Sequence, residues 1–246
     1  MLQLSENLLP QEREWIRDEC RHLMRGIWAN LEAFWVSEPD GISRASLKVH
    51  QLHLAAELGF RVPRWVVTND VATATAFLDS SPDGVAVKVL RLPILVTASR
   101  WALLYTHVVT PKDREHLESV RFGPTFLQDF VRKRMDVRVT VIGDRLFAVG
   151  IESADDEAAR VDFRRTEAYD LVHRPLALPE PVKQACMSLV HRLGLRFGAL
   201  DLLLTPEGDY IFLEINPNGQ WLWLEEMTGL PLTRSMCDLL ARGAPP

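Results

Sequence analysis

The stretch Phe197–Gln220, FGALDLLLTPEGDYIFLEINPNGQ, decides the fold that we expect for this chain. Two apolar runs flank the turn Pro206–Asp209, whose central Glu-Gly pair is typical of a two-residue β-hairpin loop. With such a loop the first and last residues of the turn pair with each other. Counting back along both strands then places Asp201 directly opposite Glu214, with Asn216 two positions further on the same face.

The opposite face of this hairpin is apolar, because side chains alternate between the two faces of a strand. Its expected members are Leu200, Leu202, Leu204, Ile211, Leu213 and Ile215. This surface requires a hydrophobic core against it.

The facing carboxylates Asp201 and Glu214 would lie roughly 5 Å apart at Cβ and repel each other. Three forms of compensation are open: protonation of one carboxyl, an arginine or lysine between them, or a bound cation. Two carboxylates and the Asn216 amide oxygen, with no Cys or His nearby, form a hard oxygen set that suits Mg²⁺. From spacing alone, an ordinary ion-pair network explains the two carboxylates equally well.

The hairpin has an Asp on its first strand and Glu-x-Asn on its second strand, followed directly by Pro-x-Gly. This arrangement resembles the metal-binding end of the ATP-grasp fold. The wider stretch Leu200–Pro231 resembles the ATP-grasp peptide maturases, which include the microviridin- and graspetide-type ligases of ribosomal peptides. The resemblance extends from about Trp35 to the C-terminus. It implies an α+β fold of two lobes, whose antiparallel sheets grip ATP between them, and it favours Mg²⁺ at Asp201, Glu214 and Asn216.

The resemblance also implies a domain organisation. Residues 1–42 would be the helical remnant of a preceding pre-ATP-grasp domain, and 43–246 the ATP-grasp domain, with a smaller lobe at about 43–126 and a metal-binding lobe at about 127–246. Apolar residues recur at three- and four-residue steps over 10–34, which predicts a helix there. Since the preceding domain is mostly absent, we expect a short form or a truncated start. The helix would then expose its apolar face, which a partner protein could cover. Separately, a homodimer stays open.

Further positions match the nucleotide-binding pattern of the family. In that pattern Lys48 and Lys88 bind the phosphates, and Asp136 meets the ribose hydroxyls. Adenine is recognised by backbone groups of Gln128, Asp129, Phe130 and Val131. Arg164 contacts the terminal phosphates and is the expected catalytic residue. A guanidinium suits that last role because it binds phosphate through two parallel donors.

From the residues alone, a simpler interpretation stays open for each of these side chains. Lys48 could be a solvated surface residue, and Lys88 an edge-strand lysine that reaches water. Asp136 could be a turn residue. Arg164 could be surface charge, with Arg165 as a weaker second choice for its role.

Hydrophobic periodicity and turn residues predict the other elements. Helices are expected at 43–59, 71–78, 181–193 and 232–241, a helix or turn at 221–227, a short helix from 113, strands at 60–68, 85–90, 105–109, 126–131, 137–142 and 146–151, and a turn at 38–41. The glycine-free stretch 91–110 does not match the glycine-rich flap of the family, and we assign it no role.

Composition excludes several classes of function. The net charge of −5, from 28 basic and 33 acidic residues, argues against a general nucleic-acid binder. Three scattered cysteines suggest no disulfide framework, so a reducing cytoplasm is expected. No signal peptide or membrane span is recognisable. The sequence contains no P-loop, GxGxxG or kinase motif.

The resemblance therefore implies an ATP- and Mg²⁺-dependent carboxylate ligase that forms an acyl phosphate. Its substrate would be a precursor peptide or another carboxylate, joined to an amine or hydroxyl as an amide or ester. Two alternatives stay open: a non-catalytic member that binds nucleotide or peptide, and a ligase of free amino acids or of a protein tail.

Overall fold

The computed structural model describes residues 7–91, 94–96, 101–103, 106–152 and 171–243. It divides into two compact units, one of residues 1–35 with 243–246 and one of residues 36–242. In the first unit, helix α1 (Pro10–Ala29) begins at a proline, and Glu12 accepts a hydrogen bond from the Leu9 N–H at 2.8 Å. The helix ends at Ala29, before the predicted position 34. The side-chain amide of the next residue, Asn30, donates to the Gly26 carbonyl at 2.8 Å. None of the residues of α1 is buried.

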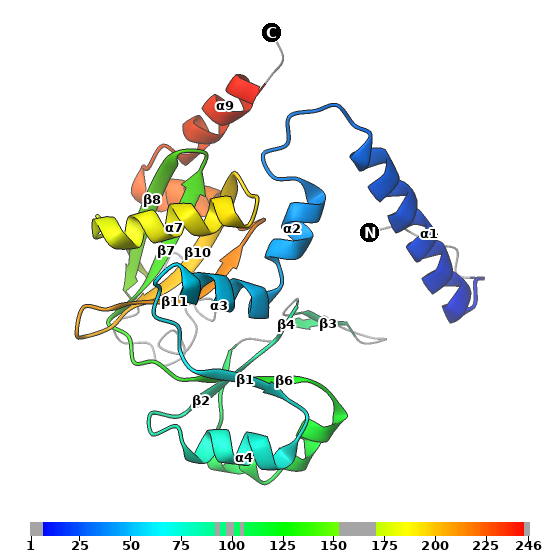
Figure 1. The fold of residues 1–246 in the computed structure, drawn as a ribbon, viewed down its shortest axis with the longest axis vertical. Helices are drawn as coiled ribbons and strands as arrows, with labels where there is room; N and C mark the ends of the chain where they lie inside the picture. The colour runs from blue at the N-terminus through cyan, green and yellow to red at the C-terminus, as the bar shows by residue number, and fades with distance from the viewer. Residues whose placement is uncertain (1–6, 92–93, 97–100, 104–105, 153–170, 244–246) are drawn as a thin grey trace. The chain divides into compact units, whose positions relative to one another are not determined.

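The larger sheet of the second unit has five antiparallel strands in the order β11-β10-β7-β8-β9. Figure 1 labels β7, β8, β10 and β11 of this sheet. The strands are β7 (Met135–Ile142), β8 (Arg145–Glu152), β9 (Val172–Pro175), β10 (Phe197–Leu204) and β11 (Tyr210–Asn216). One face packs against helices α3 (Lys48–Glu57) and α7 (Glu180–Arg192). The other face carries a second apolar cluster that includes residues of α8 (Leu222–Thr228) and α9 (Leu232–Gly243).

The smaller sheet has four antiparallel strands in the order β1-β6-β2-β5. They are β1 (Trp65–Thr68), β2 (Val85–Lys88), β5 (His107–Val108) and β6 (Thr125–Asp129). Its apolar cluster is shared with helix α4 (Val71–Asp79) and the 3₁₀ helix η1 (Leu117–Phe122). Helix α5 (Pro111–Arg114) is short, and β3 (Ile94–Val96) pairs with β4 (Trp101–Leu103). Two antiparallel sheets with helices confirm the predicted α+β class.

The central hairpin differs from the prediction at its turn. Thr205, not Pro206, pairs with Asp209, because the Thr205 N–H donates to the Asp209 carbonyl at 3.0 Å. That shift alone would separate the two carboxylates. A β-bulge at Leu213, however, restores the register, so that Asp201 lies opposite Glu214 as predicted.

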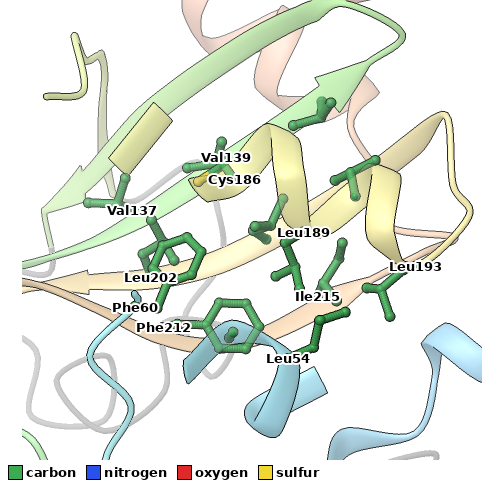
Figure 2. Packing of buried hydrophobic residues seen from close by; sticks show 14 of the residues in the cluster. Leu54, Phe60, Val137, Val139, Cys186, Leu189, Leu193, Leu202, Phe212 and Ile215 are labelled. Carbon is green, nitrogen blue, oxygen red and sulfur yellow. The ribbon is translucent and has the colours of Figure 1, made fainter. Parts of the chain in front are cut away.

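The bulge changes which side chains enter the core. Phe212, opposite Leu202, is fully buried in the cluster beneath α3 and α7, as Figure 2 shows. The predicted assignment of Ile211 and Leu213 to this cluster is therefore wrong, because one inserted residue reverses the faces on the strand beyond it. Leu200, Leu202, Leu204 and Ile215 are in the cluster as predicted.

The predicted helix over 43–59 is interrupted. Helix α2 (Pro39–Ala45) begins where a turn was expected, and α3 starts separately at Lys48. At the break, the Ser46 hydroxyl donates to the Ile42 carbonyl at 2.8 Å, and Leu47 is extended. The predicted strand over 60–68 forms only from Trp65, after Pro63, which has no N–H to donate to a sheet.

The core beneath α7 is a cluster of buried apolar side chains (Figure 2). Side chains of α7, α3 and three strands meet there, among them Leu54, Phe60, Val137, Val139, Cys186, Leu189, Leu193, Leu202, Phe212 and Ile215. Burial raises the pKa of the Cys186 thiol to about 12, because the thiolate would lose its hydration. Among the described helices, none has the length and apolar character needed to cross a bilayer.

Candidate functional site

A cavity of about 780 Å³ lies between the α2–α3 segment, the ends of β2 and β6, and one face of strands β7, β10 and β11. All of the predicted site residues that the structure describes line it. They are Lys48, Lys88, Gln128, Asp129, Phe130, Val131, Asp136, Asp201, Glu214 and Asn216. Arg164 and Arg165 lie outside the described residues.

The facing carboxylates of the hairpin are each paired with a cation. Arg138 Nη1 lies 2.7 Å from Asp201 Oδ1, and these side chains are only 9% and 14% exposed. Lys48 Nζ donates to Glu214 Oε2. Of the three forms of compensation considered from the sequence, the structure therefore contains the basic side chain, once for each carboxylate.

Gln51 explains why Lys48 reaches Glu214. Its amide nitrogen donates to the Ile215 carbonyl at 2.9 Å, and its amide oxygen accepts from the Ile215 N–H at 3.1 Å. The same nitrogen donates to the Ala45 carbonyl at 2.6 Å, so Gln51 ties α3 to the edge strand β11 and to the end of α2. The sequence contained one signal for this role. Gln51 follows Lys48 by three residues in an apolar helix, so the two side chains share a helix face.

Arg138 was not among the site residues predicted from the sequence, although it lies two residues after Asp136 on β7. Its Nε is buried and has no hydrogen-bond partner among the described residues, and its Nη2 makes only a long 3.5 Å contact with the Gln220 carbonyl. A Cβ at Gly219 would lie 2.7 Å from Nη2, so a larger residue there would force this guanidinium to shift. The sequence could not identify Arg138, because its role depends on pairing between β7 and β10.

The oxygen donors fit a divalent cation of the magnesium type. Asp201 and Glu214 offer carboxylates, and Asn216 an amide oxygen that also accepts from the Asn218 N–H at 2.9 Å. Across the described ranges, no three His, Cys, Asp or Glu side chains are grouped as a closed metal site. Such an open set suits Mg²⁺, which takes few protein carboxylates and completes its shell with phosphate oxygens and water.

The end of β6 offers few backbone groups to a ligand. The N–H groups of Asp129 and Phe130 donate to the carbonyls of Arg64 and Gly84, each at 2.9 Å. No partner for the Val131 N–H is found among the described residues. The Gln128 side-chain nitrogen is likewise buried without a partner in that part of the chain. Val131 lines the cavity, so its N–H is a backbone donor that a ligand can meet there.

The Asp136 side chain is buried beside the cavity. Lys133 Nζ lies 2.6 Å from Asp136 Oδ2, and both side chains are less than a tenth exposed. Lys88 ends β2 on the opposite wall and lines the same cavity. The cavity is therefore rich in paired charges, and three basic residues beyond the predicted set, Arg91, Lys133 and Arg138, also line it.

Solved structures resemble this chain over nearly its whole length. The macrocyclase MdnC of Microcystis aeruginosa MRC, bound with precursor peptide MdnA, is 29% identical over 99% of this chain and 76% of its own, with a TM-score of 0.87. A RiPP-associated ATP-grasp ligase of Chryseobacterium gregarium, in complex with ADP and a leader and core peptide, is 27% identical over 98% and 72%, with a TM-score of 0.87.

The macrocyclase MdnB of Microcystis aeruginosa MRC is 32% identical over 98% of this chain and 74% of its own, with a TM-score of 0.80. No family model matches the chain, and no curated protein matches it either.

Proposed function

Because this chain belongs to the family of ATP-grasp ligases that contains the macrocyclases MdnB and MdnC, we propose that it is an ATP-dependent carboxylate ligase. One observation carries the proposal: a single cavity gathers the facing carboxylates of the hairpin, two lysines and the end of β6. These parts come from distant positions in the chain.

The nucleotide would lie along this cavity. Lys48 and Lys88, with Arg164, bind the phosphates. The segment Gln128–Val131 receives adenine, and the Val131 N–H is the backbone donor left for it; Asp136 accepts from the ribose hydroxyls. The buried Lys133 holds the Asp136 carboxylate in place at 2.6 Å.

The metal-binding residues are Asp201, Glu214 and Asn216. When bound, Mg²⁺ would neutralise charge on the phosphate oxygens. The protein's own contribution is to hold two carboxylates side by side by strand pairing, with the Asn216 amide oxygen two residues further along β11. That geometry is set by the bulge at Leu213.

The reaction would proceed in two steps. A substrate carboxylate oxygen attacks the γ-phosphorus of ATP, which gives an acyl phosphate and ADP. An amine or hydroxyl then attacks the acyl carbon and releases phosphate, which leaves an amide or ester. Both steps rely on positioning and on cations that stabilise developing negative charge, so we assign no general base.

The substrate we propose is a ribosomally made precursor peptide. The similar macrocyclase MdnC was crystallised with precursor peptide MdnA, and the Chryseobacterium gregarium ligase with a leader and core peptide. The carboxylate would be an Asp or Glu side chain of the peptide, and the nucleophile a Ser, Thr or Lys side chain.

The test is ADP release with synthetic peptides that contain Asp or Glu together with Ser, Thr or Lys, followed by mass spectrometry of each peptide. The proposal predicts peptide-dependent ADP release and the loss of one water for each bond formed. Nucleotide binding without turnover on peptides, free amino acids or a protein tail would instead support a non-catalytic binding role. Turnover with free amino acids or a protein tail alone would reject the precursor peptide but keep the ligase.

A further inference from the structure

The two pairs Arg138–Asp201 and Lys48–Glu214 occupy the place where a divalent cation is expected. Both carboxylates belong to the proposed metal set, and both cations line the same cavity. Arg138 contacts one oxygen of Asp201, and Lys48 one oxygen of Glu214. A divalent cation bound to the same carboxylates would repel these two positive charges. Strand pairing fixes the carboxylates, whereas the lysine and arginine are long side chains that can move.

Displacement would leave Arg138 in an unfavourable state. Its side chain is 9% exposed, its Nε has no partner among the described residues, and its one short contact to a carboxylate is with Asp201. A buried guanidinium that loses its carboxylate is strongly destabilised unless another anion replaces it. The phosphates of a nucleotide are anions that suit a guanidinium.

We infer that Arg138 and Lys48 are exchangeable counterions: they neutralise Asp201 and Glu214 in the free protein and transfer to the nucleotide phosphates when the metal binds. Metal and nucleotide therefore bind together, and each alone binds weakly. This inference rests on the proposed function and adds Arg138 to the nucleotide site. A purely structural Arg138–Asp201 pair predicts the opposite response to removal of Arg138, because metal binding would then lose a residue that positions its ligand.

The test is binding of Mn²⁺ alone to the full chain, measured by the electron paramagnetic resonance signal of free Mn²⁺. We expect Arg138→Met and Lys48→Met to bind Mn²⁺ without nucleotide at least about fivefold more tightly than the wild type. Arg138→Lys, which keeps the charge, should stay near the wild type. Arg145→Met is the matched control, since Arg145 pairs with Asp238 at 2.9 Å on the same sheet but does not line the cavity.

Circular dichroism and thermal unfolding would establish that each variant is folded. If Arg138→Met does not fold, Lys48→Met carries the test, because its pair with Glu214 is the more exposed of the two. Unchanged or weaker Mn²⁺ binding by the folded variants would overturn the inference alone, provided that the wild type binds ADP with Mn²⁺. A wild type that binds neither Mn²⁺ nor ADP would overturn the proposed function as well.

Discussion

Glu214 illustrates how much depends on one carboxylate in this site. It faces Asp201 across the hairpin and contacts Lys48 from α3. We predict that Glu214→Gln abolishes Mg²⁺-dependent binding of ATP while the fold stays intact. A neutral amide keeps the shape of the side chain but is a poor ligand for a hard cation. Calorimetry with Mg²⁺ and with a chelator would measure this dependence.

The matched control for that variant is Glu207→Gln, at the exposed turn of the same hairpin. It should retain the wild-type response to Mg²⁺. If Glu214→Gln retained that response too, the metal assignment would be wrong.

Gly219 is the residue whose size limits the site most directly. An added Cβ would lie 2.5 Å from the Ala199 Cβ and 2.7 Å from Arg138 Nη2. We predict that Gly219→Ala lowers the free energy of unfolding by about 1–3 kcal/mol, as overpacking does. Denaturant titration would measure this change. The control is Gly123→Ala, which meets no atom within 4 Å and should be close to neutral; equal stability of both variants would contradict the predicted contact.

Among the elements, α3 matters most for the site, because it carries Lys48 and is held by Gln51. We predict that Gln51→Leu costs about 2 kcal/mol or more of unfolding free energy. The buried N–H and C=O of Ile215 and the carbonyl of Ala45 would lose their partner. The variant should also bind nucleotide more weakly, since Lys48 would no longer be fixed against β11.

The comparison for this variant is Gln184→Leu on α7. That glutamine is exposed and bonds only to Glu180 among the described residues, at 2.6 Å. Its substitution should change the unfolding free energy little. If the two leucine variants were equally stable, Gln51 would not join α3 to the sheet.

Helix α7 gives a separate prediction about reactivity. Its Cys186 is fully buried and has a raised pKa of about 12, whereas Cys237 on α9 is exposed. Because the thiolate is the reactive form, a maleimide at neutral pH should label Cys237 in the folded protein and leave Cys186 unmodified. Peptide mapping by mass spectrometry would show this. In urea all three cysteines should react; labelling of Cys186 in the native protein would contradict the packing of α7.

The central hairpin shows what could be predicted from the sequence and what could not. The pairing of Asp201 with Glu214 was predicted from the turn residues and is confirmed. The route to it was wrong, because a shifted turn and a bulge at Leu213 cancel each other. A bulge depends on how the strand packs against the core and on the edge contacts made by α3, so turn residues alone could not show it.

Other errors have the same origin in tertiary contacts. Periodicity predicted the helix around Lys48 but not its break before that residue, which a serine side chain and an extended Leu47 create. Comparison with the family's motifs identified site residues from the short stretches of sequence around them. It did not find Arg138 or Gln51, whose partners are 63 and 164 residues away in the chain.

At the scale of the whole molecule, two antiparallel sheets contribute to one cavity within the unit 36–242. The smaller sheet supplies Lys88 and the end of β6, and the larger one supplies the carboxylates and Arg138. The predicted Arg164 lies outside the described residues, so its contact with the terminal phosphates stays a prediction. The proposed nucleotide and metal positions rest on the charges that the structure describes and not on Arg164.

The most direct measurement is calorimetric titration of the full 246-residue chain with ATP in the presence of Mg²⁺. The account predicts a single site with micromolar affinity that is lost when Mg²⁺ is chelated. A folded sample that binds no nucleotide would contradict it, and the ligase proposed here would then have to be abandoned.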